Sequence, residues 1–450
     1  MMTKISKSIL VFLVGIITFL SGNRVLCQNP TAHWQQYKYV EQAGFSPEKL
    51  NVAKAFYDSL QSSAFMIVQG GKVVAAWGEV NRRFKVHSIR KSLLNSLYGI
   101  YVAKGTIDTN LTLRQLRFTD RDSLSLLEQS AKIVHLLKAR SGVYHRAAAE
   151  SDWAKELRPK RNSHLPDSLW FYNNWDFNVL GTIFERLTHA SIYMALYDNI
   201  AVPLQMEDYR IMDGEYFYER ELSDYPAYHL KMSARDLARY GQLFLQKGSW
   251  NGKEILSDTW VESSTYPHSK HGGGTKIGRW YGYLWGVSEY FGKYGMYFAS
   301  GVGGQFLAVF PKEDLILVNL SNTYLNKKVL DRELTRLFDL ILAAKIDKPS
   351  SNPELVTLES KSRVPIDTCC WQIDRSKYVG NWTIDDRRVS IIELNGALLI
   401  KDYDQNFRLL PLSPSRFFLE DIEKHLNVEF DGAGFPSRFY YDEHEEKPKH

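Results

Sequence analysis

Apolar and polar residues alternate with two different periods in the first part of the chain. The stretch 46–60 begins with Ser-Pro and carries apolar residues every three or four positions, so it predicts a helix with an N-cap serine. Two apolar runs follow at 64–68 and 73–77, on either side of Gly70 and Gly71. Such runs around a two-glycine turn predict a β-hairpin.

Helical spacing returns after this hairpin in residues 85–100, "KVHSIRKSLLNSLYGI". The apolar positions that follow Ser88 fit a helix with one broad buried face. Positions i and i+3 lie on the same side of a helix. The Ser88 hydroxyl and the Lys91 amine are therefore expected to meet in its first turn.

Both patterns recur up to residue 345. They predict an α+β fold in which the later strands return to the sheet begun by the first hairpin. The expected helices cover about 176–188, 233–245 and 329–343, and the expected strands cover 284–287, 296–299, 306–310 and 315–320.

The composition changes after this main domain, which is expected to span residues 28–345. Residues 346–372 are rich in proline and polar side chains, which predicts a linker. Residues 373–441 hold short strand-like runs separated by turn residues, which predicts a small all-β, barrel-like module. Residues 442–450 form a charged tail.

The start of the chain has the pattern of an export signal. Lys4 and Lys7 precede an apolar run at 9–20, which is too short to span a bilayer. We expect residues 1–27 to be a signal peptide, the mature chain to have no membrane span, and the protein to be exported to the periplasm or the extracellular space. An uncleaved signal or a lipid on Cys27 would instead anchor it to a membrane.

The charge of the mature chain excludes one class of partner. Removing the signal peptide takes away three basic residues and no acidic residue, so the net charge falls from +5 to +2. A nearly neutral chain has no electrostatic reason to bind nucleic acid. The remaining cysteines, Cys369 and Cys370, are adjacent and poorly placed to bridge each other, so the fold is expected to depend on its core.

Ser88 and Lys91 are candidates for a nucleophile and its base. A helix N-terminus places backbone N–H groups and a positive dipole end near the serine oxygen. Burial of the lysine would lower its pKa and let it accept a proton from the serine. The same S-x-x-K spacing occurs at Ser46 and Lys49, where helix capping explains the serine, so capping remains the alternative for Ser88.

A second candidate motif, Tyr172-Asn173-Asn174, lies about 80 residues further on. A phenolate beside a lysine in a low-dielectric cleft can take a serine proton and return it to a leaving group. Asn174 could bind a substrate carbonyl from the same side of an extended loop. The alternative is an aromatic loop packed on a helix. The same Y-x-N pattern also occurs at Tyr324-Leu325-Asn326, just after an expected strand, so the pattern alone is not specific.

A third candidate motif, with Ser300, Gly301 and Gly303, immediately precedes an expected strand. Glycines allow a close backbone approach and leave N–H groups free, so one of these groups could join the Ser88 N–H in an oxyanion hole. An ordinary hairpin turn is the alternative, and Gln305 either points into the cleft or packs beneath it. No H-E-x-x-H or Cys/His pattern accompanies the motifs, so we expect neither a metal nor a cofactor.

The three motifs in this order resemble the serine β-lactamase/penicillin-binding superfamily, above all its class C β-lactamase-related hydrolases and esterases. The likeness covers about residues 40–345 and includes "HLLKARSGVYH" at 135–145. It implies a central antiparallel sheet with helices on both faces and an all-helical lobe inserted between strands.

The resemblance also implies a role for each candidate residue. Ser88 would be the nucleophile, Lys91 would assist its deprotonation, and Tyr172 would be the general base and acid. Asn174 would position the substrate, and the N–H of Ser88 together with an N–H near Gly303 would hold the oxyanion.

One motif departs from the family pattern. Antibiotic-hydrolysing members carry Lys or His followed by a small residue and Gly, where this chain has Ser300-Gly301-Val302-Gly303. Without that cation we expect an ester or amide hydrolase acting on a small-molecule or peptide substrate that is less anionic. Two alternatives remain: a non-catalytic peptide or glycan binder, and a true β-lactamase or D-peptidase. Nothing in the sequence indicates the oligomeric state.

Overall fold

The computed structural model describes residues 29–270, 277–359, 373–394, 396–402 and 405–442. The expected signal peptide, Cys27, Cys369, Cys370 and all but the first residue of the expected tail lie outside the described residues.

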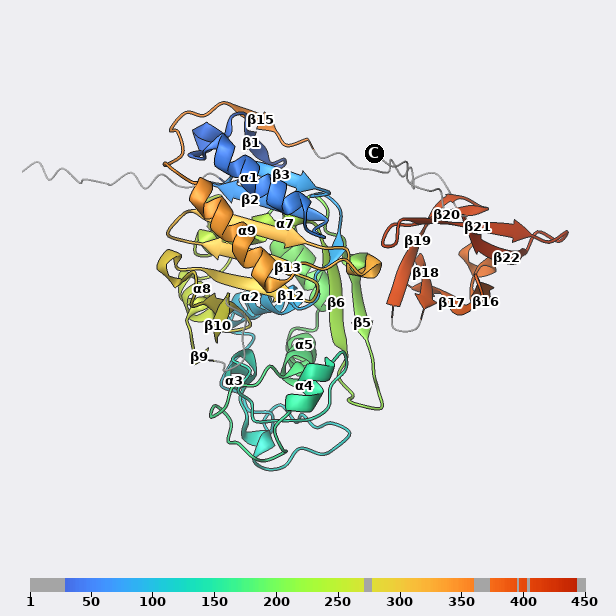
Figure 1. Cartoon of the computed structure of the whole chain (residues 1–450). Helices are drawn as coiled ribbons and strands as arrows, with labels where there is room; N and C mark the ends of the chain where they lie inside the picture. The colour runs from blue at the N-terminus through green and yellow to red at the C-terminus, as the bar shows by residue number, and fades with distance from the viewer. Residues whose placement is uncertain (1–28, 271–276, 360–372, 395, 403–404, 443–450) are drawn as a thin grey trace, which may run out of the picture.

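A ten-stranded sheet forms the centre of the main domain (Figure 1). Its neighbouring strands pair in antiparallel fashion, except β1 and β3, which pair in parallel. β2 of the first hairpin lies beside β14, so the later strands return to the sheet begun by that hairpin, as expected from the sequence. In spatial order the strands are β15 (Leu355–Thr357), β1 (Gln35–Tyr37), β3 (Lys72–Gly78), β2 (Ala64–Gln69), β14 (Leu315–Leu320), β13 (Gln305–Phe310), β12 (Tyr297–Gly301), β11 (Gly286–Ser288), β10 (Gly278–Tyr281) and β9 (Ser269–Lys270).

Helices cover both faces of this sheet. Along β14 the side chains alternate: Leu315 and Leu317 join the cluster under α1 and α9, whereas Ile316 and Val318 join the larger cluster that includes α2 and α7. This alternation buries β14 on both sides and explains its continuous apolar run. The helices concerned are α1 (Pro47–Asp58), α9 (Asp331–Ala344), α2 (Ile89–Ala103), α7 (Ala234–Leu245) and α8 (Asp258–Thr265).

A largely helical lobe is inserted between the hairpin and the later strands, as expected from the sequence (Figure 1). It is joined to the sheet domain by a small antiparallel sheet in the order β4-β6-β5. The elements of this region are β4 (Phe84–Lys85), α3 (Ile133–Leu137), α4 (Asp152–Leu157), α5 (Asn174–Thr188), α6 (Ile192–Leu196), β5 (Gly214–Phe217) and β6 (Ala227–Met232).

The C-terminal module is an antiparallel sheet of seven strands, which confirms the all-β prediction. Its first and last strands, β16 and β22, also contact each other, so the sheet closes into a barrel-like shape around its own apolar core. The strands are β16 (Gly380–Ile384), β17 (Arg387–Leu394), β18 (Ala397–Asp402), β19 (Gln405–Ser413), β20 (Arg416–Leu419), β21 (Lys424–Phe430) and β22 (Pro436–Tyr441).

The region expected to be a linker contributes a strand to the main domain. Residues 355–357 form β15, which pairs with β1 at the edge of the large sheet. The leucine, valine and threonine of β15 favour extended backbone, and β1 offers a free edge that this segment can cover. The strand was not predicted, because the proline and polar residues around it indicated a linker.

Candidate functional site

Ser88 lies in the tight turn that joins β4 to α2. It is the N-cap residue of α2, yet its side chain makes no capping hydrogen bond, so its Oγ atom remains available for chemistry. Ser46 differs, because its Oγ accepts a hydrogen bond from the Lys49 N–H, which fits the capping role expected there. The structure thus separates the two S-x-x-K sequences.

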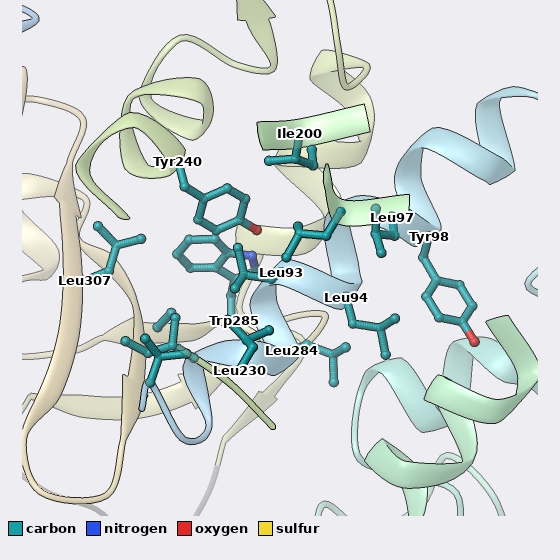
Figure 2. Packing of buried hydrophobic residues seen from close by; sticks show 14 of the residues in the cluster. Leu93, Leu94, Leu97, Tyr98, Ile200, Leu230, Tyr240, Leu284, Trp285 and Leu307 are labelled. Carbon is teal, nitrogen blue, oxygen red and sulfur yellow. The ribbon is translucent and has the colours of Figure 1, made fainter. Parts of the chain in front are cut away.

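The buried face of α2 fixes the position of this turn. Figure 2 shows Leu93 and Leu94 of α2 among side chains that include Tyr240, Leu284 and Trp285. All five side chains are at most 3% exposed. Interiors packed to this extent resist small displacements, so the first turn of α2 forms a rigid platform for Ser88.

The structure brings Ser88, Lys91 and Tyr172 together. The Lys91 Nζ atom lies 2.8 Å from Ser88 Oγ and 2.5 Å from Tyr172 Oη. Lys91 is only 3% exposed, and its Nζ atom also lies over the rings of Tyr172 and Phe177, 4.4 and 4.5 Å from their centroids. Tyr172 comes from the segment that leads into α5, so the helical lobe supplies one side of this cluster and α2 supplies the other.

The environment of the cluster favours uncharged side chains. Burial lowers the pKa of Lys91 well below its ordinary value, and the positive charge of buried Arg90 lowers this pKa further. Burial raises the pKa of Tyr172, although its hydrogen bond with Ser88 and the charge of Arg90 oppose that shift. Both shifts act against the charged forms, the ammonium of Lys91 and the phenolate of Tyr172.

The edge of β12 approaches Ser88 at Gly301. A Cβ atom on Gly301 would lie 2.5 Å from the Val86 carbonyl oxygen and 3.0 Å from the Ser88 backbone nitrogen. Only glycine allows this contact, because a side chain here would push the strand away from the turn. Ser300, the preceding residue, lines the same cavity as Ser88.

Two of the predicted substrate-binding residues lie elsewhere. Gly303 is in the β12–β13 turn with φ +84°, where a Cβ atom would lie 2.3 Å from Thr323 Cγ2, and it does not line the cavity. Asn174 is buried at the start of α5, and its Nδ2 atom donates to the Ala149 carbonyl oxygen at 2.9 Å. Gln305 packs beneath the strands, since its side chain pairs with the backbone of Ser321.

The cavity beside Ser88 has a volume of about 300 Å³ and mostly apolar walls. The sequence motifs missed most of this lining. Trp170 could have been found, because it lies two residues before Tyr172 in an extended segment and so points to the same side, whereas no local signal marks the others. The described residues that line the cavity are Ser88, Lys91, Ser92, Trp153, Trp170, Tyr172, Gly278, Tyr281, Leu284, Gly286, Phe298, Ala299, Ser300, Phe306 and Asp331.

The described residues contain no group of three or more His, Cys, Asp or Glu side chains arranged to hold a metal ion. They also contain no helix with the length and apolar character needed to cross a bilayer.

Comparisons with known proteins identify the family and the fold. A family model described as Beta-lactamase matches residues 51–340, which is more than half of the chain. The octameric penicillin-binding protein homologue from Pyrococcus abyssi has a TM-score of 0.51 at 16% identity, with 85% of this chain and 93% of that chain covered. A penicillin-binding protein homologue from Caulobacter crescentus has a TM-score of 0.50 at 15% identity, with 67% and 99% covered. At such identities the likeness concerns the fold, and a search of curated protein sequences found no match. The chain belongs to the beta-lactamase family.

Proposed function

We propose that this protein is a serine hydrolase that cleaves an ester or an amide through an acyl-enzyme on Ser88. One observation carries the proposal: Ser88 Oγ, Lys91 Nζ and Tyr172 Oη converge within hydrogen-bond distance beside an apolar cavity. A nucleophile with an adjacent base is the arrangement that nucleophilic catalysis requires.

In the acylation step, Ser88 Oγ attacks the substrate carbonyl carbon while the neutral Lys91 amine takes its proton. The Ser88 backbone N–H and a backbone N–H from the edge of β12 beside Gly301 stabilise the oxyanion that forms. The Tyr172 hydroxyl then protonates the leaving alcohol or amine and recovers a proton from the Lys91 ammonium. The pKa directions support Lys91 as the base, a role that the family resemblance assigns chiefly to Tyr172.

In the deacylation step, a water molecule attacks the acyl carbon and passes its proton to the same pair. The carbonyl–Ser88 ester bond breaks, a carboxylic acid leaves, and Ser88 regains its proton.

The aromatic walls formed by Trp153, Trp170 and Tyr281 favour a substrate with an apolar part. Apart from Lys91, the described lining residues include no cationic side chain, which supports an uncharged ester or amide over an anionic β-lactam.

The test compares the wild-type protein with Ser88→Ala on a panel of p-nitrophenyl esters, aryl amides and the β-lactam nitrocefin. We expect ester or amide turnover that Ser88→Ala abolishes, and a fluorophosphonate adduct on the Ser88 peptide by mass spectrometry. Ser46→Ala, which alters the other S-x-x-K serine, is the matched control and should retain activity. Unchanged turnover in Ser88→Ala would refute the proposal, an unreactive wild-type protein would favour a binder, and nitrocefin turnover alone would favour a β-lactamase.

We also propose that residues 1–27 direct export to the periplasm or the extracellular space. The basic start, the short apolar run and the nearly neutral mature chain support this location. N-terminal sequencing of the protein recovered from a bacterial host tests it: a start at or near Gln28 is expected, and a retained Met1 would refute cleavage.

A further inference from the structure

The C-terminal module reaches the main domain next to the nucleophile turn. The turn between β20 and β21, residues 420–423, contacts two arginines that immediately precede β4. Arg82 Nη1 lies 2.6 Å from Glu423 Oε1, and Arg83 Nη2 lies 3.2 Å from Glu420 Oε2. Because β4 leads directly into the turn that carries Ser88, the module touches the segment that delivers the nucleophile.

Asp421 lies at the centre of this contact and joins two segments of the main domain. Its Oδ2 atom lies 2.5 Å from Lys231 Nζ of β6, and its carbonyl oxygen accepts a hydrogen bond of 2.8 Å from Asn322 Nδ2. Asn322 directly precedes the 3-10 helix η6, where the Tyr324 ring packs on Phe407 of the module at 5.3 Å. Asp421 is 5% exposed, so water does not readily replace these contacts.

The same two segments, β6 and η6 (Thr323–Leu325), hold the turn before Ser88. The Val86 N–H donates to the Leu230 carbonyl oxygen of β6 at 3.1 Å, and His87 Nε2 lies 2.9 Å from Thr323 Oγ1 of η6. His87 has a φ of +49°, a conformation that persists only where neighbouring groups fix it. Burial, together with the charges of Lys85, Arg90 and Lys91, lowers the pKa of His87 to about 3, so its ring stays neutral.

We propose that Asp421 is a positioning residue for the Ser88 nucleophile, acting through β6 and through the contact of Thr323 with His87. Loss of its carboxylate leaves Lys231 without this partner. Lys231 Nζ also lies over the Tyr324 ring of η6, 5.4 Å from its centroid, so both β6 and η6 are held less firmly. The turn then holds Ser88 Oγ less firmly against the base, and small displacements of reacting groups are costly in rate. The inference rests on the proposed function and gives the module a role that its fold alone does not reveal.

The substrate cavity should remain intact when this contact is lost. Its described lining residues all come from the main domain, and none comes from the module. The inference therefore predicts a change in kcat with little change in KM, whereas a module that binds substrate would change KM. It also predicts slower reaction of Ser88 with a fluorophosphonate, because this reagent depends on the same activated hydroxyl.

The experiment uses the full chain and compares wild type, Asp421→Asn, Thr323→Val and the double variant. Arg416→Ala is the matched control, because Arg416 pairs with Asp442 inside the module, 2.8 Å away, and contacts neither β6 nor η6 in the described pairs. We expect each single variant to lower kcat and the fluorophosphonate labelling rate about tenfold or more, with KM within about twofold. Because both act on one turn, the double variant should lose less than the product of the single effects.

The outcomes separate the two proposals. A wild-type protein that neither hydrolyses any ester or amide nor takes up the fluorophosphonate refutes the proposed function. An active wild type with Asp421→Asn and Thr323→Val at wild-type kcat and labelling rate refutes the positioning role alone. If Asp421→Asn does not fold, Lys231→Met takes its place, because it breaks the same ion pair from the β6 side. A wild-type kcat and labelling rate in that variant would refute the positioning role as well.

Discussion

The Lys91 Nζ atom lies 2.8 Å from Ser88 Oγ, and the two residues are one helical turn apart at the start of α2. Lys91 is only 3% exposed. This pairing combines a serine hydroxyl at a helix N-terminus with an amine whose pKa burial lowers. The distance alone does not distinguish the base, but the directions of the two pKa shifts favour Lys91 over Tyr172. The proposed mechanism therefore makes the rate depend on whether Lys91 has lost its proton.

The pH profile of kcat/KM should therefore have widely separated limbs. Activity is expected to rise with pH as Lys91 loses its proton, well below about pH 10.4, where an ordinary lysine titrates. It should fall only above about pH 10, since burial raises the pKa of the Tyr172 phenol that donates a proton. Stopped-flow rates on a p-nitrophenyl ester measure both limbs, and an ascending limb near pH 10.4 would contradict a neutral Lys91.

Lys91→Met should abolish turnover and stabilise the fold. The unfolded chain binds a proton at this lysine more readily than the folded chain does, so stability is lost as pH falls from the unfolded pKa toward the folded one. The variant removes that loss, and a gain of about 1 kcal/mol would raise the melting midpoint by about 2–4 °C. Calorimetry at several pH values should show the largest gain at low pH and none above about pH 10.4. An equal gain at every pH would point to packing instead.

Local motifs predicted the parts of the site that depend on local geometry. Ser88 and Lys91 are three positions apart on one helix, so their contact follows from helical spacing alone. Tyr172 required the family resemblance, because only the tertiary packing of the lobe brings its segment to α2. The sequence distinguished Ser46 from Ser88 only by the elements around them. The hydrogen bonds now show that Ser46 caps its helix and that Ser88 does not.

Features that depend on long-range pairing were missed or shifted. An oxyanion donor was expected near Gly303, and the register of β12 against β13 places Gly301 beside Ser88 and Gly303 in the turn, so the identity of this donor stays a prediction. Asn174 was expected at the substrate, yet the lobe turns its amide to the Ala149 carbonyl. The contact of Asp421 with β6 joins residues 190 positions apart, a separation at which no sequence pattern operates.

Tyr172→Phe should slow the reaction according to its leaving group. Proton transfer by a positioned side chain contributes about 10²–10⁴-fold, and alkyl alcohols and amines need this proton far more than p-nitrophenolate does. We therefore expect kcat to fall by about 10⁴-fold for alkyl esters or amides and by about 10²-fold for p-nitrophenyl esters. Tyr144→Phe is the matched control, because the Tyr144 hydroxyl is buried without a hydrogen-bond partner among the described residues. Equal losses on both substrate classes would contradict the role of Tyr172 as the acid.

Gly301→Ala should damage acylation through the backbone. The new Cβ atom would meet the Val86 carbonyl oxygen at 2.5 Å and the Ser88 nitrogen at 3.0 Å, so β12 must move away from the nucleophile turn. The backbone donor that β12 supplies would move away from the developing oxyanion, and removal of one such donor costs about 10²–10³-fold in kcat. Pre-steady-state acylation of a p-nitrophenyl ester measures this loss. Gly292→Ala is the control, since a Cβ atom there meets nothing within 4 Å, and it should keep the wild-type rate. If Gly301→Ala is acylated at the wild-type rate, the close approach of β12 to Ser88 has no catalytic function. The oxyanion would then be held by other groups.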